Sequence, residues 1–344
     1  MAGILIIPAV IILGFLLFLT VTDYRPAERE PILIGGKGKQ LPLLQQEFTF
    51  LTWNLGYSGL GKQMDFFYEG GTRVRPDKKE FTQYLEGICK SLSANDSIDF
   101  ILLQETDLHS KRSYFKDEVA KIGTLFPGRC LLFTRNYDSR FVPVPLDNPL
   151  GRVVSGIACF PKYRPRAAER IDFGSRFPWP KQLVLLKRCM MVIRYTLSSG
   201  KELVIVNLHN STFDKGGSLR KKELRMIHTF VISEYSKGNY VIAGGDWNTN
   251  PRGFLPVSVI SGDLAKTIDP ALDSTFLPGW RFAYDPLVPS NRDVDIPYLK
   301  GKTLTTIIDF YVVSPNVEVQ SVHTLATGFN FSDHQPVIMK VALK

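Results

Sequence analysis

Hydrophobic residues follow two different patterns along the chain, and the change comes near residue 48. From Ile4 to Val21 the sequence reads ILIIPAVIILGFLLFLTV without a charged side chain. As a helix this run rises about 27 Å, close to the roughly 30 Å of a bilayer's hydrocarbon core. The pattern predicts a transmembrane anchor at 1–22. A cleavable signal peptide is the rival interpretation, but the run lacks a basic segment before it and a clear small-x-small cleavage site after it.

Residues 23–47 separate this apolar run from the rest of the chain. Prolines and glycines recur here too often for a helix or a long strand. The segment is therefore interpreted as a linker, followed by one folded domain at 48–344. The breaking residues are Pro26, Pro31, Gly35, Gly36, Gly38 and Pro42.

The rest of the chain alternates short apolar runs with polar loops. After Pro76, apolar residues recur every three or four positions from Phe81 to Leu92, and again from Leu224 to Tyr235 after Ser218. This spacing predicts two amphipathic helices. Many strands and few helices, with no repeat, indicate one mixed α/β domain. Strands are expected at 48–55, 98–103, 153–160, 183–195, 203–208, 240–243, 307–313 and 337–342.

Composition narrows the class of protein without identifying a partner. With 344 residues, 44% of them apolar and 22% charged, the chain is neither a disordered tail nor a disulfide-rich miniprotein. The net charge of +9 favours an anionic partner, but it is spread along the chain. The four cysteines lack the paired spacing of metal or redox motifs, so we expect buried free thiols.

Polar side chains stand where the apolar runs end. A buried strand fixes such a group in place while the following loop exposes it, which is typical of enzymes built on sheets. These positions are Asn54, Gln104 with Glu105, Asn207 with His209, Asp246 with Asn248, Asp309, and Ser332 with Asp333 and His334.

This ordered set resembles the endonuclease/exonuclease/phosphatase superfamily, of which deoxyribonuclease I is a member, over residues 48–343. Among its branches, the loops are most similar to those of a membrane-anchored bacterial one. The resemblance implies a four-layer α/β/β/α sandwich of two mixed sheets flanked by helices. In this chain the predicted transmembrane helix precedes the sandwich in the sequence. It also implies a metal-dependent phosphoesterase, either a phosphodiesterase or a phosphatase, in which water attacks the phosphate directly.

The resemblance also assigns roles to the site residues. Glu105 is the principal ligand for Mg²⁺, or for Mn²⁺, and Asp333 binds or shapes the metal site. Asn54 binds the metal or orients Glu105. Hard oxygen ligands of this kind suit Mg²⁺.

The remaining roles concern proton transfer and phosphate binding. By resemblance, Asp246 orients or deprotonates the attacking water and Asn248 donates to a phosphoryl oxygen. His334 acts as base or phosphate donor, with its tautomer fixed by Asp309. His209 is expected to be a donor or an acid.

The substrate stays open at this level. Two loops, 56–71 and 285–302, flank the expected site, and Arg292 in the second is a candidate phosphate ligand through its guanidinium fork. Arg112 is expected to be a solvated charge. The expected substrate is a phospholipid head group, a small phosphodiester or nucleic acid. With nucleic acid as the substrate, the protein would be a membrane-tethered endonuclease or exonuclease. A catalytically silent phosphate-binding module is the alternative of another class.

The predicted location of the protein rests on the N-terminal apolar run and on the basic residues that follow it. The chain is expected to be a single-pass bacterial membrane protein and a monomer. Basic residues after the anchor, among them Arg25 and Arg29, favour a cytoplasmic domain. A soluble hydrolase is usually tethered in order to display it, and this favours a domain on the outer side of the membrane. We prefer the outer side, but the orientation stays open.

Overall fold

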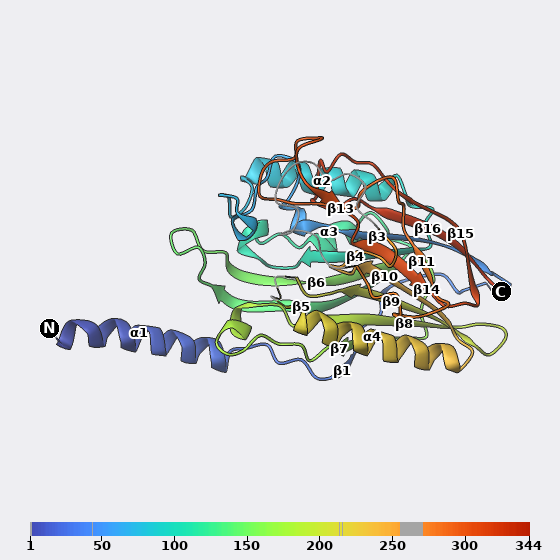
Figure 1. Cartoon of the computed structure of the whole chain (residues 1–344), viewed down its shortest axis with the longest axis horizontal. Coiled ribbons are helices and arrows are strands. Elements are labelled where there is room, and N and C mark those ends of the chain that lie inside the picture. Colours follow the sequence, from blue (N-terminus) through green and yellow to red (C-terminus); the bar gives the residue numbers. More distant parts are fainter. Residues whose placement is uncertain (1, 43, 213, 215, 255–270) are drawn as a thin grey trace.

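Two mixed seven-stranded β-sheets pack face to face at the centre of the molecule (Figure 1). The computed structural model describes residues 2–42, 44–212, 214, 216–254 and 271–344. Strands β9 and β10 are parallel, as are β3 and β4, and the other pairs are antiparallel. In order, the first sheet is β1 (Arg29–Pro31), β7 (Ala167–Asp172), β8 (Cys189–Thr196), β9 (Glu202–His209), β10 (Tyr240–Asp246), β14 (Asp309–Val313) and β11 (Arg281–Ala283). The second is β15 (Val317–Thr324), β16 (Val337–Leu343), β3 (Glu47–Asn54), β4 (Phe100–Asp107), β6 (Gly151–Pro161), β5 (Cys130–Val142) and β2 (Gly35–Gly36).

Helices cover the outer face of each sheet. Helices α2 (Lys78–Ser93) and α3 (Glu118–Gly123) lie on the second sheet, and α4 (Ser218–Ser236) lies on the first (Figure 1). A core of side chains from both sheets, such as Phe50 and Ile205, fills the space between them. The predicted sandwich of two mixed sheets with helices is confirmed. The smaller elements are β12 (Asn291–Arg292), β13 (Thr305–Thr306) and the 3₁₀ turns η1 (Gly56–Ser58), η2 (Phe67–Glu69), η3 (Lys111–Ser113) and η4 (Lys181–Val184).

Helix α2 shows why the local sequence forms the expected element. Asp77 accepts a hydrogen bond from the Glu80 N–H at 2.8 Å, and the Glu80 carboxylate accepts one from the Asp77 N–H at 2.9 Å. This capping box satisfies two backbone donors that the first turn leaves free. The stripe that begins at Phe81 is buried against the second sheet.

Most predicted elements form, but several strands were not predicted. The eight expected strands correspond to β3, β4, β6, β8, β9, β10, β14 and β16, and both expected helices form. Strand β5 was missed because polar residues interrupt its apolar pattern, and β15 because most of it lies exposed at a sheet edge. The four cysteines are buried free thiols, as expected.

The linker prediction for 23–47 is wrong in part, because this segment adds a strand to each sheet. Residues 29–31 pair with β7 and residues 35–36 pair with β5. Ile32 is buried in the core between the sheets. Gly36 has φ +73°, and a Cβ there would lie 2.2 Å from the Arg129 carbonyl oxygen. Glycine here allows the close approach of two backbones and does not mark a free tether.

Helix α1 (Ala2–Val21) forms where the N-terminal apolar run predicts a helix. It projects from the sandwich, with its C-terminal end against the body (Figure 1). Across the described part of the chain, no helix combines the length and the apolar character needed to cross a bilayer. The predicted transmembrane helix is therefore not confirmed.

Candidate functional site

The polar strand ends meet in one cleft of about 440 Å³. Strand register explains part of this meeting, because Asp246 on β10 lies opposite His209 on β9 and Asp309 on β14. In the other sheet, Asn54 on β3 lies opposite Gln104 on β4. The two face-to-face sheets thus bring residues far apart in the sequence to one place.

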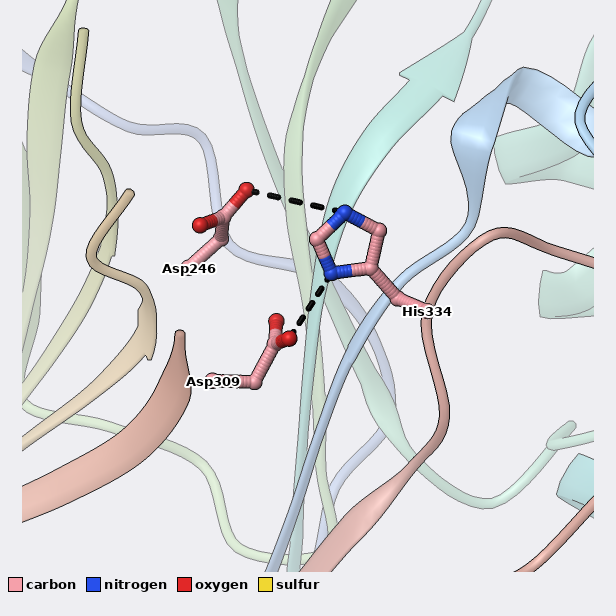
Figure 2. Close-up of side chains that lie close together, drawn as sticks. All are labelled: Asp246, Asp309 and His334. Carbon is pink, nitrogen blue, oxygen red and sulfur yellow. Dashed lines mark hydrogen bonds and ion pairs between the residues drawn. The ribbon is translucent and has the colours of Figure 1, made fainter. Parts of the chain in front are cut away.

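His334 is held between two aspartates (Figure 2). Its Nδ1 lies 2.7 Å from Asp309 Oδ2, and its Nε2 lies 4.0 Å from Asp246 Oδ2. Asn291 contacts the same Nε2, with Nδ2 at 3.0 Å. Asp309 therefore fixes the ring orientation and leaves Nε2 on the side of Asp246.

Burial and neighbouring charges shift the pKa values of these groups. Burial alone would lower the pKa of His334, but Asp309, Asp333 and Asp246 outweigh it and raise the pKa well above its usual value. Burial raises the pKa of Asp246 to about 7; His334 opposes this rise and Asp309 adds to it. A protonated imidazole beside a carboxylate that titrates near neutral pH can share protons with a reacting group.

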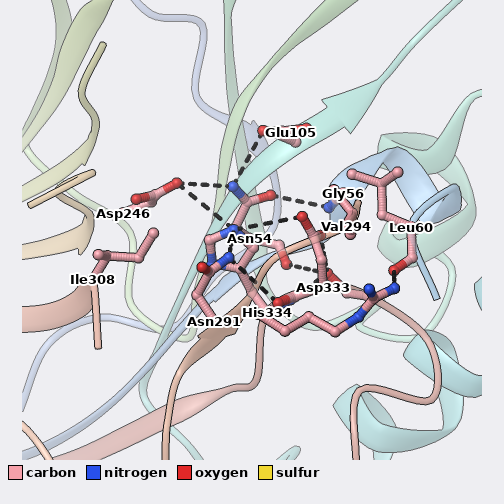
Figure 3. Close-up of polar contacts among 12 residues, drawn as sticks. Asn54, Gly56, Leu60, Glu105, Asp246, Asn291, Val294, Ile308, Asp333 and His334 are labelled. Carbon is pink, nitrogen blue, oxygen red and sulfur yellow. Dashed lines mark hydrogen bonds and ion pairs between the residues drawn. The ribbon is translucent and has the colours of Figure 1, made fainter. Parts of the chain in front are cut away.

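Asn54 connects Glu105 with Asp246 (Figure 3). Its Nδ2 donates to Glu105 Oε1 at 3.2 Å and to Asp246 Oδ2 at 3.0 Å, while its Oδ1 accepts from the Gly56 N–H at 3.0 Å. The amide oxygen proposed as a metal ligand is thus used by the backbone. Of the two predicted roles of Asn54, the geometry favours orientation of Glu105 and not metal binding.

Glu105 reaches the cleft through an irregularity in β4. The register with β6 shifts between Leu103 and Thr106, and Glu105 has φ +51°. Such a bulge turns a side chain away from the pleat at a cost in backbone strain, which is a frequent feature of functional sites. The Glu105 side chain is 24% exposed, whereas the side chains of Asp246 and Asp309 are almost fully buried.

His209 faces both carboxylates that Asn54 connects. Its Nε2 lies 3.3 Å from Asp246 Oδ2 and 3.7 Å from Glu105 Oε1. Burial lowers the pKa of His209 well below its usual value, and the positive charge of Arg188 adds to this shift. A neutral imidazole suits the predicted role of hydrogen-bond donor and not that of acid.

Asn248 does not present a free amide nitrogen to the cleft. Its Nδ2 donates to the Asn210 carbonyl at 2.9 Å and lies 3.3 Å from Asp246 Oδ2. The Asn248 N–H also donates to Asp246 Oδ1 at 2.9 Å. The predicted donation to a phosphoryl oxygen would therefore have to replace one of these bonds. In this geometry Asn248 orients Asp246.

Asp333 lies where the loop before β16 meets the end of β3. Ser332 Oγ donates to the Asn54 carbonyl at 2.8 Å, which fixes this loop against β3. Gly56 has φ +51°, and a Cβ there would lie 2.6 Å from Asp333 Oδ1, so only glycine leaves room for the carboxylate. Burial raises the pKa of Asp333 to about 6; His334 opposes this rise and Glu105 contributes to it.

Glu105 and Asp333 are the candidate ligands for a divalent cation. Both carboxylates line the cleft, and they offer the hard oxygen ligands that Mg²⁺ and Mn²⁺ prefer. Ligand atoms of Asp246, Asp309 and His334 also lie within 4.8 Å of one another. There, however, Asp309 and His334 already satisfy each other by a hydrogen bond.

Arg292 is held mainly by the protein itself. It is 1% exposed and its two terminal nitrogens donate to five backbone carbonyls, while its buried Nε has no partner among the described residues. These bonds leave little of its fork for the predicted phosphate contact. The guanidinium instead holds the loop 56–71 against the loop 285–302. The accepting carbonyls belong to Leu60, Gly61, Met64, Asp293 and Ile296.

Two arginines of the cleft were missed or misjudged from the sequence. Arg112 is buried, pairs with Asp107 through two hydrogen bonds of 3.0 and 2.9 Å, and stacks on Tyr57, so it is not a solvated charge.

Arg188 precedes β8 and lines the cleft, and it is 5% exposed. Its side chain forms no hydrogen bond or ion pair with any described residue, and its buried NH1 group has no partner there. Nothing in the local sequence distinguishes it from a surface arginine.

Known proteins share the sequence pattern and the fold. Residues 51–334 match the model of the Endonuclease/Exonuclease/phosphatase family. None of the curated proteins matches the chain. A family structure from Beutenbergia cavernae DSM 12333 aligns with a TM-score of 0.55 at 15% identity and covers 87% of this chain and 72% of its own. One from Bacteroides vulgatus has a TM-score of 0.51 at 15% identity, over 87% and 100% of the two chains. Humanized D. rerio TDP2 carrying 14 mutations has a TM-score of 0.52 at 15% identity, over 86% and 98%.

Proposed function

The chain belongs to the Endonuclease/Exonuclease/phosphatase family, whose members hydrolyse phosphoester bonds, and we propose that it is a metal-dependent phosphoesterase. The observation that carries this proposal is the convergence of four separate segments: Glu105, Asp246 and His334 line one cleft, and Asp309 is buried behind His334 and hydrogen-bonded to it. The substrate is a phosphodiester or a phosphomonoester. Water attacks the phosphorus directly, because the cleft groups that we assign to the reaction include no covalent nucleophile.

We infer that Glu105 and Asp333 hold the metal ion, which is Mg²⁺ or Mn²⁺. Both carboxylates line the cleft, and each offers the oxygen ligands that these cations prefer. When bound, the cation neutralises negative charge on the phosphoryl oxygens.

Asp246 accepts the proton of the attacking water. Its pKa of about 7 lets the carboxylate take up a proton near neutral pH, and Asn54 and Asn248 hold it in place through hydrogen bonds. His334 is protonated and fixed by Asp309, and its Nε2–H donates to a phosphoryl oxygen that takes the place of the Asn291 amide beside it. The neutral His209 is a further donor on the same side.

Arg188 takes the phosphate-binding role first given to Arg292. A buried guanidinium without a partner among the described residues retains its donors for an anion. Arg188 lines the same cleft as Glu105 and Asp246, and burial lowers its pKa while Glu223, Glu105 and Asp246 act against this shift.

Hydrolysis of bis(p-nitrophenyl) phosphate with Mg²⁺ or Mn²⁺ tests the proposal. Glu105→Gln and Asp309→Asn should each lower turnover by at least about a hundredfold, the effect of losing an electrostatic or acid–base contributor. Lys79→Glu, an exposed change on α2, is the matched control and should retain wild-type turnover. If wild type, Glu105→Gln and Asp309→Asn hydrolyse generic phosphoesters equally slowly, the chain is a silent phosphate-binding module instead.

A further inference from the structure

Helix α1 exposes apolar side chains in every direction. Its sequence contains no charged residue. The consecutive residues Val10, Ile11, Ile12 and Leu13 are all more than half exposed. Four consecutive helical residues are each rotated by about 100°, so together they cover the whole circumference of the helix. A protein groove would cover one face of such a helix, whereas lipid would surround all of them.

Two aromatic side chains of the sandwich lie beside this helix. The Phe141 ring at the end of β5 meets the Phe15 ring edge-on at 6.0 Å. Trp179 Nε1 donates to Thr20 Oγ1 at 3.2 Å, and 55% of the Trp179 residue remains exposed. Tryptophan favours the boundary between lipid and water, because its ring is apolar and its N–H is polar.

Exposed basic residues lie on the flank of α1 and on the two segments that contact α1. Arg25 donates to the Thr20 carbonyl at 3.1 Å, and in the sequence Arg140 precedes Phe141 and Lys181 follows Trp179 by two residues. Asp23, the first acid after α1, is paired with Lys187 at 3.0 Å. Basic side chains near an apolar surface attract anionic lipid head groups.

The segment that carries Trp179 also lines the cleft. Trp179 belongs to the segment 177–186, in which Phe177, Lys181, Leu185 and Leu186 line one wall of the cleft. That wall is mainly apolar, and the Lys181 ammonium lies 4.4 Å from the centre of the Phe177 ring.

We propose that α1, Phe141 and Trp179 form a lipid-docking face that binds the surface of an anionic phospholipid bilayer. Arg25, Arg140 and Lys181 supply the charge that selects anionic lipid. Docking brings the apolar wall of the cleft to the bilayer, so the substrate is a phosphate ester with an apolar chain. This last assignment rests on the proposed phosphoesterase function, whereas the docking itself does not.

Trp179 provides a direct probe of docking. The other three tryptophans, Trp53, Trp247 and Trp280, are buried, so Trp179 dominates any change in emission on lipid contact. The full chain is mixed with vesicles of phosphatidylcholine, or of phosphatidylcholine and phosphatidylglycerol in equal parts. Emission should shift to the blue with the anionic vesicles, and brominated phosphatidylcholine included in them should quench it. Trp179→Phe should remove both signals, and unchanged emission of the wild type would overturn the proposal.

Vesicle sedimentation measures the contribution of charge and of apolar contact. Arg140→Glu should weaken binding to the anionic vesicles at least about fivefold, the effect of one basic residue near the surface. Phe141→Ser with Trp179→Ser should weaken binding to both kinds of vesicle, whereas Lys79→Glu on α2 should match the wild type. Self-association of the chain without sedimentation on vesicles would assign the face to a second copy and overturn the proposal.

The same vesicles separate docking from catalysis. Glu105→Gln should sediment like the wild type while it loses hydrolysis. Docking without hydrolysis of any phosphoester by the wild type would refute the proposed function and leave the lipid-docking face standing. Hydrolysis of soluble phosphoesters without docking on vesicles would refute the lipid-docking face and leave the proposed function standing.

Discussion

Arg292 and Arg188 lie in different parts of the cleft, and both are buried, yet their surroundings differ completely. Around Arg292, backbone carbonyls from two loops accept hydrogen bonds from the guanidinium. Around Arg188, no described residue accepts one. A saturated guanidinium is part of the framework of the protein, whereas an unsaturated one retains its binding capacity for a ligand.

The difference teaches how to distinguish structural from ligand-binding charge in a cleft. Burying a charge without a partner costs free energy, so such a group persists where a ligand compensates for it. Glu223, Glu105 and Asp246 partly offset the charge of Arg188 through space. The sequence places Arg292 in a conspicuous loop and gives Arg188 no motif, so sequence reasoning selects Arg292.

Replacing Arg188 gives the sharpest test of this difference. Arg188→Met should lower kcat/KM for bis(p-nitrophenyl) phosphate by about 100- to 1,000-fold, because a charged donor to the phosphate is lost. Its free energy of unfolding should be equal to or above that of the wild type, because a buried unpaired charge is removed. Kinetics and urea unfolding of the same preparation measure both quantities.

Inorganic phosphate serves as the control ligand for Arg188. It should raise the Tm of the wild type and leave that of Arg188→Met unchanged, because only the native state of the wild type binds it. If Arg188→Met unfolds easily and binds phosphate like the wild type, Arg188 is a structural residue and the comparison fails.

Replacing Arg292 should have the opposite outcome. Arg292→Met leaves five buried or half-buried carbonyls without their donor, so the free energy of unfolding should fall by about 3 kcal/mol or more. Urea unfolding measures this loss. Stability equal to that of the wild type, together with a weakened response to phosphate, would show that Arg292 binds the anion after all.

A third arginine, Arg194, extends the comparison, because its pair with Glu234 makes the stability of the protein depend on pH. Arg194 donates to Glu234 through two bonds of 2.9 and 3.0 Å, and with Lys237 and Asn239 it lowers the pKa of Glu234 to about 2 despite burial. A depressed carboxyl pKa stabilises the fold above the unfolded-state pKa of about 4.3, and this contribution is lost as pH falls from there towards 2.

Unfolding at two pH values tests this pair. Between pH values of about 7 and 3, wild type should lose roughly 2 kcal/mol more stability than Glu234→Gln, in which this carboxylate no longer titrates. Equal losses in the two proteins would show that the pair does not contribute.

The architecture was largely predictable, and the exceptions have physical causes. Buried strands such as β4 and β9 form continuous apolar runs, and α2 carries both its cap and its stripe in the local sequence. Strand β5 alternates buried and exposed residues, with polar side chains such as Asn136 buried at the cleft, so no apolar run marks it. The edge strands β1 and β2 contain only a few residues, and distant partners define them.

The site was predictable as a set of residues but not as a set of contacts. Motif order indicates Glu105, Asp246, Asp309 and His334, and the structure places three of them in one cleft with Asp309 buried behind His334. The second partner of Asn54, the engaged amide of Asn248 and the hydrogen bonds of Arg292 to the loop 56–71 depend on atoms from distant segments. The hydrogen bond of 2.7 Å from Gln104 to Asn207, which links the two sheets behind the site, is likewise visible only in three dimensions.

The sequence by itself determined which apolar segments become buried strands, which helix is apolar on all sides, and which acids and imidazoles stand at strand ends. These properties follow from local spacing, because side chains repeat every two residues in a strand and every 3.6 in a helix. The tertiary structure alone decided which arginine donates to backbone carbonyls and which finds no acceptor among the described residues. A hydrogen bond across 232 residues, such as that from Arg292 to Leu60, depends on how the two loops meet in space, and no local pattern encodes that meeting.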